Sequence, residues 1–151
     1  MKTLKAGDSV PLFIVNDHMG NQQSLTQYKG FKIVVFFYPK ANTPGCTTEA
    51  CDLRDHFKEL KDAGYVLLGV SADSEKKQKK FADKFEFPFP LLADTEKVVI
   101  DAFGVWGAKK FMRKEYDGIH RKTFIIDKKG IVERVIDKVK IKEHAAQILI
   151  N

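Results

Sequence analysis

Cysteine is scarce in this sequence, which has two cysteines, Cys46 and Cys51, among 151 residues. So few thiols exclude the disulfide-rich scaffold of small secreted proteins, and in a reducing compartment such a pair is more often catalytic than a structural crosslink. The chain also lacks any apolar run near the ~20 residues that span a bilayer. Residues 1–7 lack the apolar core of a signal peptide, so we expect a cytoplasmic protein.

Segments that separate domains are missing as well. The sequence has no linker rich in Pro, Gly or Ser, no low-complexity tract and no repeat with a period of about 20 to 50 residues. A chain of 151 residues has the size of one domain. We therefore predict a single domain over residues 1–151.

Basic residues are in excess, and the formal net charge is +6 at pH 7. This excess permits a protein that binds nucleic acid or an anionic surface. The densest basic patch consists of five lysines of one predicted helix: Lys76, Lys77, Lys79, Lys80 and Lys84. Phe81 and Phe85 lie one turn apart in the same helix, so the lysines are better explained as its solvated face. No nucleic-acid motif or aromatic stacking platform accompanies them.

Both cysteines lie in one short run, Pro39 to Cys51, which follows an apolar segment. Residues 33–38 (IVVFFY) are β-branched and aromatic, as is typical of a buried strand that ends at the proline. Residues 43–62 carry apolar side chains at three- and four-residue spacings, which predicts a helix. Cys46 then lies in the first turn, where unpaired N–H groups and the positive end of the helix dipole stabilise a thiolate relative to a thiol.

Cys46 has two explanations at this point. A free cysteine is usually buried and behaves as a small hydrophobic side chain. The preceding Thr43-Pro44-Gly45 is a turn that no packed core requires. We therefore expect the sulfur at a loop-to-helix junction and away from the apolar stripe of the helix, as in a thiol redox enzyme.

Pro39, Thr43 and Cys46 have the P-x3-T-x2-C spacing of the peroxiredoxin active-site loop, and the sequence resembles that family. Cys51 lies five residues after Cys46, and the run that contains both cysteines (GCTTEAC) resembles the branch of bacterioferritin comigratory proteins, also called Q-type peroxiredoxins. Four further segments agree in order: residues 69–73 (GVSAD), 89–94 (FPLLAD), 104–107 (GVWG) and 118–127 (GIHRKTFIID). The resemblance implies an α/β, thioredoxin-like fold of the peroxiredoxin variant, with a central mixed β-sheet flanked by helices and an amino-terminal β-hairpin.

The resemblance also implies the reaction. Cys46 would attack the terminal oxygen of hydrogen peroxide or an organic hydroperoxide and become a sulfenic acid. Cys51 would resolve that acid as an intramolecular disulfide, with thioredoxin or glutaredoxin as the reductant. Neither metal, haem nor flavin is implied. Because the second cysteine lies in the same chain, no dimer is needed and a monomer is expected.

Other site residues follow from the same resemblance. Thr43 would accept a hydrogen bond from a peroxide oxygen, while Pro39 belongs to the motif and Pro44 would stiffen the loop and shield the sulfenate. Arg121 would hold the thiolate and polarise the O–O bond with its fixed guanidinium. Glu49 would orient that arginine from the first helical turn, where its negative charge suits the helix end.

Arg121 lies far from Cys46 in the sequence, so its role needs a structural reason. Residues 121–127, a turn at 128–130 and residues 131–136 form a hairpin signature. If the first hairpin strand runs antiparallel to the 33–38 strand, its start meets the end of that strand. This arrangement predicts that Arg121 lies near Cys46.

The remaining pattern alternates between strands and helices, as in α/β layer folds. The expected elements are a hairpin over 10–21, strands at 65–71 and 89–92, and helices at 74–86, 96–103 and 141–150. The single tryptophan, Trp106, lies between glycines in an expected turn, and we predict that it covers a core edge.

Two other thiol chemistries are weaker alternatives. A metal site would combine the cysteines with some of the four histidines: His18, His56, His120 and His144. The histidines are scattered and no C-x2-C pair is present, so the spacing does not match a familiar zinc motif. A disulfide oxidoreductase would favour C-x-x-C after the strand, whereas here four residues separate the cysteines.

Overall fold

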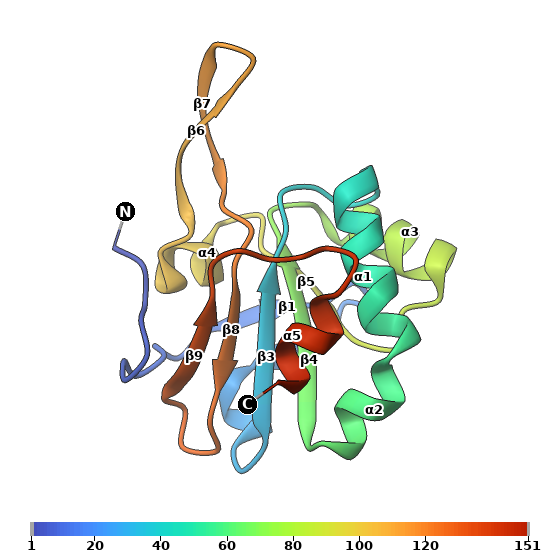
Figure 1. The fold of residues 1–151 in the computed structure, drawn as a ribbon, viewed down its shortest axis with the longest axis vertical. Coiled ribbons are helices and arrows are strands. Elements are labelled where there is room, and N and C mark those ends of the chain that lie inside the picture. Colours follow the sequence, from blue (N-terminus) through green and yellow to red (C-terminus); the bar gives the residue numbers. More distant parts are fainter. Residues whose placement is uncertain (1, 151) are drawn as a thin grey trace.

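A central five-stranded β-sheet organises the protein (Figure 1). The computed structural model describes residues 2–150. The strand order across the sheet is β5-β4-β3-β8-β9; β3, β4 and β5 are parallel, and β8 and β9 are antiparallel to their neighbours. The strands are β3 (Lys32–Phe37), β4 (Tyr65–Ser71), β5 (Leu91–Ala93), β8 (Thr123–Ile126) and β9 (Val132–Ile136).

Strand β3 explains why the sheet is covered on both faces. Side chains alternate along a strand, so Val34 and Phe36 point to one face while Ile33, Val35 and Phe37 point to the other. All five are buried. A continuous apolar run, in place of the apolar-polar alternation of a half-exposed strand, is what burial on both faces requires.

Helices cover the two faces unequally (Figure 1). One face packs against α1 (Pro44–Asp55), α2 (Phe57–Asp62), α3 (Glu75–Phe85) and α5 (His144–Leu149). The other face packs against α4 (Val98–Phe103) and the amino-terminal segment. That segment contains the hairpin of β1 (Ile14–Asn16) and β2 (Gln22–Ser24), followed by the 3-10 helix η1 (Leu25–Tyr28). The predicted mixed α/β fold with an amino-terminal hairpin is confirmed.

The predicted helix over residues 43–62 is wrong in one respect, because the chain leaves helical geometry at His56. Its φ is −110° and its ψ is 17°, and its ring Nδ1 lies 2.9 Å from the Asp52 carbonyl oxygen. The apolar spacing crosses this break because Leu53 and Leu60 pack into the same core cluster. The last helix is also shorter than predicted and begins at His144.

A second hairpin, formed by β6 (Trp106–Phe111) and β7 (Lys114–Ile119), extends away from the sheet (Figure 1). The sequence pattern does not indicate this hairpin, and it predicts a turn at Trp106. The turn residues Met112 and Arg113 have positive φ values of 48° and 68°, a conformation usually signalled by Asn-Gly. Trp106 packs against the edge of a core cluster as predicted, and Lys97 Nζ lies 3.8 Å from its ring centroid.

The lysines of α3 lie on its solvated face, as predicted. Lys76, Lys77 and Lys80 are exposed, whereas Phe81 and Ala82 are buried against the sheet. Among residues 2–150, no helix is both long and apolar enough to cross a membrane.

Candidate active site

The loop between β3 and α1 positions the first cysteine. Pro44 occupies the first turn of α1, where its fixed φ suits a helix start and its missing N–H leaves no donor unpaired. Thr43 is the N-cap residue, with extended backbone at φ −99° and ψ 157°. Cys46 is therefore in the first turn of α1, as predicted, and the loop over residues 38–43 connects this turn to the carboxyl end of β3.

The side chain of Cys46 is buried, with 2% of its surface exposed. It belongs to the core cluster that contains Tyr38 and Ala50. The expectation that it lies away from the apolar stripe is therefore wrong, because the first turn of α1 packs onto the sheet. Its sulfur is a buried atom with a charged neighbour.

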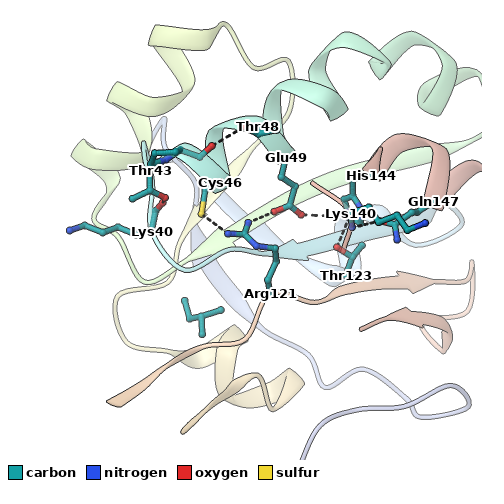
Figure 2. A network of polar contacts seen from close by, with 12 residues as sticks. Lys40, Thr43, Cys46, Thr48, Glu49, Arg121, Thr123, Lys140, His144 and Gln147 are labelled. Atoms are coloured by element: carbon teal, nitrogen blue, oxygen red, sulfur yellow. Dashed lines mark hydrogen bonds and ion pairs between the residues drawn. The ribbon is translucent and has the colours of Figure 1, made fainter. Parts of the chain in front are cut away.

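That neighbour is Arg121, which lies just before β8. Antiparallel pairing of β3 with β8 places Phe36 opposite Thr123, so Arg121 lies beside the end of β3. Its Nη2 donates to Cys46 Sγ at 3.4 Å and its Nη1 donates to Glu49 Oε1 at 2.6 Å (Figure 2). The guanidinium thus bridges the sulfur and the carboxyl group of Glu49.

Gly45 makes room for this guanidinium. A Cβ atom at this position would lie 3.3 Å from Arg121 Nη2, which is closer than the usual van der Waals separation. From the sequence alone, this glycine is expected only to form a turn. The contact depends on a residue distant in the sequence, so no local pattern could reveal it.

Glu49 is the sixth residue of α1 and is fully buried. The expectation that it lies in the first turn is wrong, and its burial opposes the negative charge assigned to it there. Burial raises the pKa of Glu49 to about 7, although the charge of Arg121 and its hydrogen bond act in the opposite direction. The carboxyl group can therefore carry a proton near neutral pH.

The raised pKa of Glu49 predicts a pH-dependent stability. Between the ordinary value of 4.5 and about 7, the folded state holds a proton that the unfolded state has released, so the free energy of unfolding falls as pH rises. At ~1.4 kcal/mol per pKa unit, the loss is about 3 kcal/mol. The lowered pKa of His144 makes stability rise with pH over part of this range, so the loss is measured as the difference between the wild type and Glu49→Gln in urea unfolding of the reduced proteins at pH 5 and pH 8. Glu59→Gln, which changes an exposed carboxylate, is the control; an unchanged pH slope in Glu49→Gln would contradict the prediction.

The hydroxyl of Thr43 is held by the same loop. Its Oγ1 donates to the carbonyl oxygen of Lys40 at 2.8 Å. The proton is therefore engaged, and the oxygen lone pairs remain able to accept a hydrogen bond. Pro39, at the other end of the motif, is the second residue after β3, which ends at Phe37.

Cys51 lies in the same helix as Cys46, and both are free thiols. Its side chain is partly buried against the core. Burial raises the pKa of the Cys51 thiol, and the charge of Arg54 only partly offsets this. The intact helix therefore keeps Cys51 protonated and separate from Cys46.

A buried histidine completes the polar network (Figure 2). His144 begins α5, is fully buried and lies 3.6 Å from Glu49 Oε2 through its Nε2. Thr123 Oγ1 is 2.7 Å from the same nitrogen. From the sequence, this histidine is a candidate only as a metal ligand. Within the part of the chain that the structure describes, no three His, Cys, Asp or Glu residues form a group that could hold a metal ion.

Comparison with known proteins agrees with this geometry. Residues 6–135 match the AhpC/TSA family. Peroxiredoxin Bcp of Escherichia coli (strain K12) is 49% identical over 149 residues, which cover 99% of this chain and 96% of that protein. Peroxiredoxin Bcp of Bacillus subtilis (strain 168) is 47% identical over 148 residues, covering 97% of this chain and 94% of that protein.

Solved structures give the same result. A mutant of Xylella fastidiosa PrxQ superposes with a TM-score of 0.92 at 29% identity, over 99% of this chain and 95% of that chain. The bacterioferritin comigratory protein of Xanthomonas campestris, in structures concerned with its alkyl peroxide reduction activity, has a TM-score of 0.86 at 36% identity, over 94% and 95% of the two chains. The fold is thus the thioredoxin-like fold of peroxiredoxins. The chain belongs to the AhpC/TSA family, in the group of peroxiredoxin Bcp and PrxQ proteins, and is a thiol-dependent peroxidase.

Proposed function

We propose that Cys46 is the nucleophile that reduces hydrogen peroxide and organic hydroperoxides in this single-domain protein. Its sulfur bonds to one peroxide oxygen, the O–O bond breaks, and the departing oxygen takes up a proton to leave as water or an alcohol. Two electrons pass from sulfur to the peroxide, and Cys46 becomes a sulfenic acid.

The observation that carries this proposal is the bridge that Arg121 forms between Cys46 Sγ and Glu49 Oε1, at 3.4 Å and 2.6 Å. A guanidinium is planar and permanently charged, so a carboxyl oxygen that accepts from one edge, whether or not Glu49 carries a proton, fixes the direction of the other edge. The edge of the guanidinium that faces Cys46 stabilises the thiolate and the negative charge that develops on the peroxide oxygens. Because the guanidinium is already oriented, little reorganisation is needed in the transition state.

The loop residues have supporting roles in the proposal. Thr43 accepts a hydrogen bond from the peroxide, since its own proton is engaged by Lys40. Pro44 keeps the first turn of α1 rigid beside the sulfur and lacks an N–H that could bind water. Pro39 fixes the path of the chain where β3 ends.

Cys51 is proposed to resolve the sulfenic acid. Its sulfur attacks Cys46, a disulfide forms and water leaves; a dithiol protein, thioredoxin or glutaredoxin, then reduces the disulfide and becomes oxidised itself. Because both sulfurs belong to α1, the cycle needs no second chain, and we propose a monomer. A disulfide that must be reduced in each cycle suits a cytoplasmic location.

Peroxide consumption coupled to NADPH oxidation tests the cycle. With thioredoxin and thioredoxin reductase, NADPH loss should require peroxide, thioredoxin and this protein together; glutaredoxin with glutathione and glutathione reductase forms the second arm. Cys46→Ser is the matched control and should be inactive in both arms. Peroxide consumption that proceeds with dithiothreitol but with neither dithiol protein would overturn the assigned reductants and leave the peroxidase step intact.

Arg121→Lys should slow the oxidation of Cys46 by about a hundredfold or more, in line with the loss of a donor that stabilises developing charge. Lysine keeps the charge but cannot contact sulfur and carboxylate through one planar group. Stopped-flow fluorescence of Trp106 after peroxide addition measures the rate. Arg134→Lys is the control, because Arg134 donates to carbonyl oxygens of α5 and not to the site. A rate equal to that of the wild type in Arg121→Lys would show that the guanidinium does not act on the reacting atoms.

A further inference from the structure

The hydrogen bonds of His144 define its tautomer. Gln147 Oε1 lies 2.8 Å from Nδ1 and also accepts from the backbone N–H of Lys140 at 2.9 Å, so the atom that faces the ring is the amide oxygen. An amide oxygen only accepts, so Nδ1 carries a proton. In the neutral ring Nε2 is then an acceptor, and it receives the hydroxyl proton of Thr123 at 2.7 Å.

The other neighbour of Nε2 is an unsatisfied carboxyl oxygen. Within residues 2–150, Glu49 Oε2 is buried without a hydrogen-bond partner and lies 3.6 Å from His144 Nε2. A buried carboxylate oxygen without a partner is costly. A proton held between Oε2 and Nε2 removes that cost once the Thr123 hydroxyl turns its own proton away from Nε2 and the two atoms, 3.6 Å apart, close to hydrogen-bond distance.

The charges of the cluster favour the same proton. Arg121 supplies one positive charge, while a Cys46 thiolate and a Glu49 carboxylate would supply two negative charges. One additional proton on Glu49 or His144 makes the buried cluster neutral. A neutral buried cluster has a lower desolvation cost than the same cluster with a net negative charge. Burial raises the pKa of Glu49 and lowers that of His144, so the carboxyl group is the main holder of the proton.

We propose that His144 is a positioning residue that shares one proton with Glu49, and that this proton keeps Arg121 available to the Cys46 thiolate. When the proton is held, Glu49 is neutral or paired with an imidazolium, and Arg121 directs its charge to the sulfur. When the proton is lost, the carboxylate competes with the thiolate for the guanidinium. The oxidation rate should therefore decline at the pH where the pair loses its proton.

Other charged groups near the pair belong to the elements packed against it. On α1, Asp52 Oδ2 accepts from the backbone N–H of Ala145 at 2.8 Å, and its other oxygen lies 3.6 Å from the exposed His56 ring. On β9, Arg134 donates to backbone carbonyl oxygens at the end of α5. The negative charge of Asp52 raises the pKa of His144, and the positive charge of Arg121 lowers it.

Two substitutions should move the pH midpoint of the decline in the Cys46 oxidation rate in opposite directions. His144→Gln keeps a polar group near Nε2 but cannot take the proton, so the midpoint of the decline should move about one unit lower, as expected for coupled sites. Thr123→Val removes the donor that occupies the Nε2 lone pair, so the imidazole can accept from Glu49 and the midpoint should move higher. Glu49→Gln should abolish the decline.

The measurement is the stopped-flow oxidation rate of Cys46 between pH 5 and pH 9, with His56→Gln as a control for ordinary histidine titration. Histidine nitrogen chemical shifts of the reduced protein should independently show a proton on Nδ1 of His144. A rate lowered equally at every pH in His144→Gln, with the midpoint unchanged, would reduce His144 to a structural role and overturn the proposal. If His144→Gln fails to fold, an unmoved midpoint in Thr123→Val overturns it equally.

This proposal rests on Cys46 as the nucleophile, and the same experiment separates the two. A wild-type protein whose Cys46 is not oxidised by peroxide at any pH would remove the proposed role of the cysteine. A Cys46 that is oxidised with a pH midpoint insensitive to both variants would remove only the role of His144.

Discussion

Cys46→Ser should abolish peroxide turnover, with a loss of at least about a thousandfold, or ~4 kcal/mol of transition-state stabilisation. A serine hydroxyl is far harder to ionise than a thiol, and Arg121 beside it is no general base that could remove its proton. The fold should persist, because oxygen replaces sulfur at one buried position without adding volume. Peroxide consumption with dithiothreitol as reductant measures the loss, and circular dichroism checks the fold.

Cys51→Ser is the matched control for this experiment. It removes the other thiol of α1 and leaves Cys46 with its arginine, so without dithiothreitol, which would itself reduce the sulfenic acid, about one equivalent of peroxide should still be consumed and a sulfenic acid should accumulate. A dimedone-type probe and mass spectrometry would locate that acid. Near-normal turnover in Cys46→Ser, or no first oxidation in Cys51→Ser, would contradict the assigned roles.

The sequence predicts the parts of this site that are local. The apolar strand, the proline and the helical spacing are contiguous, and together they place Cys46 in the first turn of a helix. Arg121 is distant in sequence, yet the hairpin signature after it predicts antiparallel pairing with β3. The observed register of Phe36 opposite Thr123 follows that prediction, and the arginine lies 3.4 Å from the sulfur.

The sequence does not predict which polar groups the helices bury. From the sequence, Glu49 is expected to be a favourable charge near a helix start, but Arg121 and His144 lie against its carboxyl group and it has no solvent contact. Its environment depends on His144 and Thr123, which belong to separate elements. Periodicity reports which face of a helix is apolar, and it carries no information on which polar residues from other elements meet there.

The hairpin β6–β7 was missed for a different reason. When both faces of a hairpin are exposed to solvent, its strands need no alternation of apolar and polar residues. The middle of this hairpin, where Lys109 pairs with Tyr116, shows no such alternation. Its turn uses Met112 and Arg113 at positive φ, where glycine or asparagine would have signalled the reversal. Strand prediction from sequence depends on burial on at least one face, and this hairpin extends beyond the core.

Formation of the Cys46–Cys51 disulfide should unwind the first turns of α1. In an α-helix, Cα atoms five residues apart are roughly 8 to 9 Å apart and their side chains diverge by about 140°. A disulfide requires a Cα separation of about 4.4 to 6.8 Å. Both cysteines lie within the twelve residues of α1, so the bond cannot form while the helix is intact. The helix must open before Cys51 can reach the sulfenic acid.

Unwinding also removes the contacts that define the reduced site. Cys46 would leave the core cluster that it shares with Tyr38 and Ala50, and Arg121 would lose its sulfur partner. Cys51, whose pKa is raised by partial burial, would become exposed and more easily ionised. The same opening would present the finished disulfide to a dithiol reductant.

Amide hydrogen exchange of the reduced and oxidised protein measures this change. Protection across residues 44–54 should fall by at least about a hundredfold on oxidation, which corresponds to ~3 kcal/mol of local opening free energy. The amides of α3 serve as the internal control, because that helix contains no cysteine and should exchange equally in both states. With the disulfide verified by mass spectrometry, equal protection of residues 44–54 in the two redox states would show that the helix accommodates the bond without unwinding.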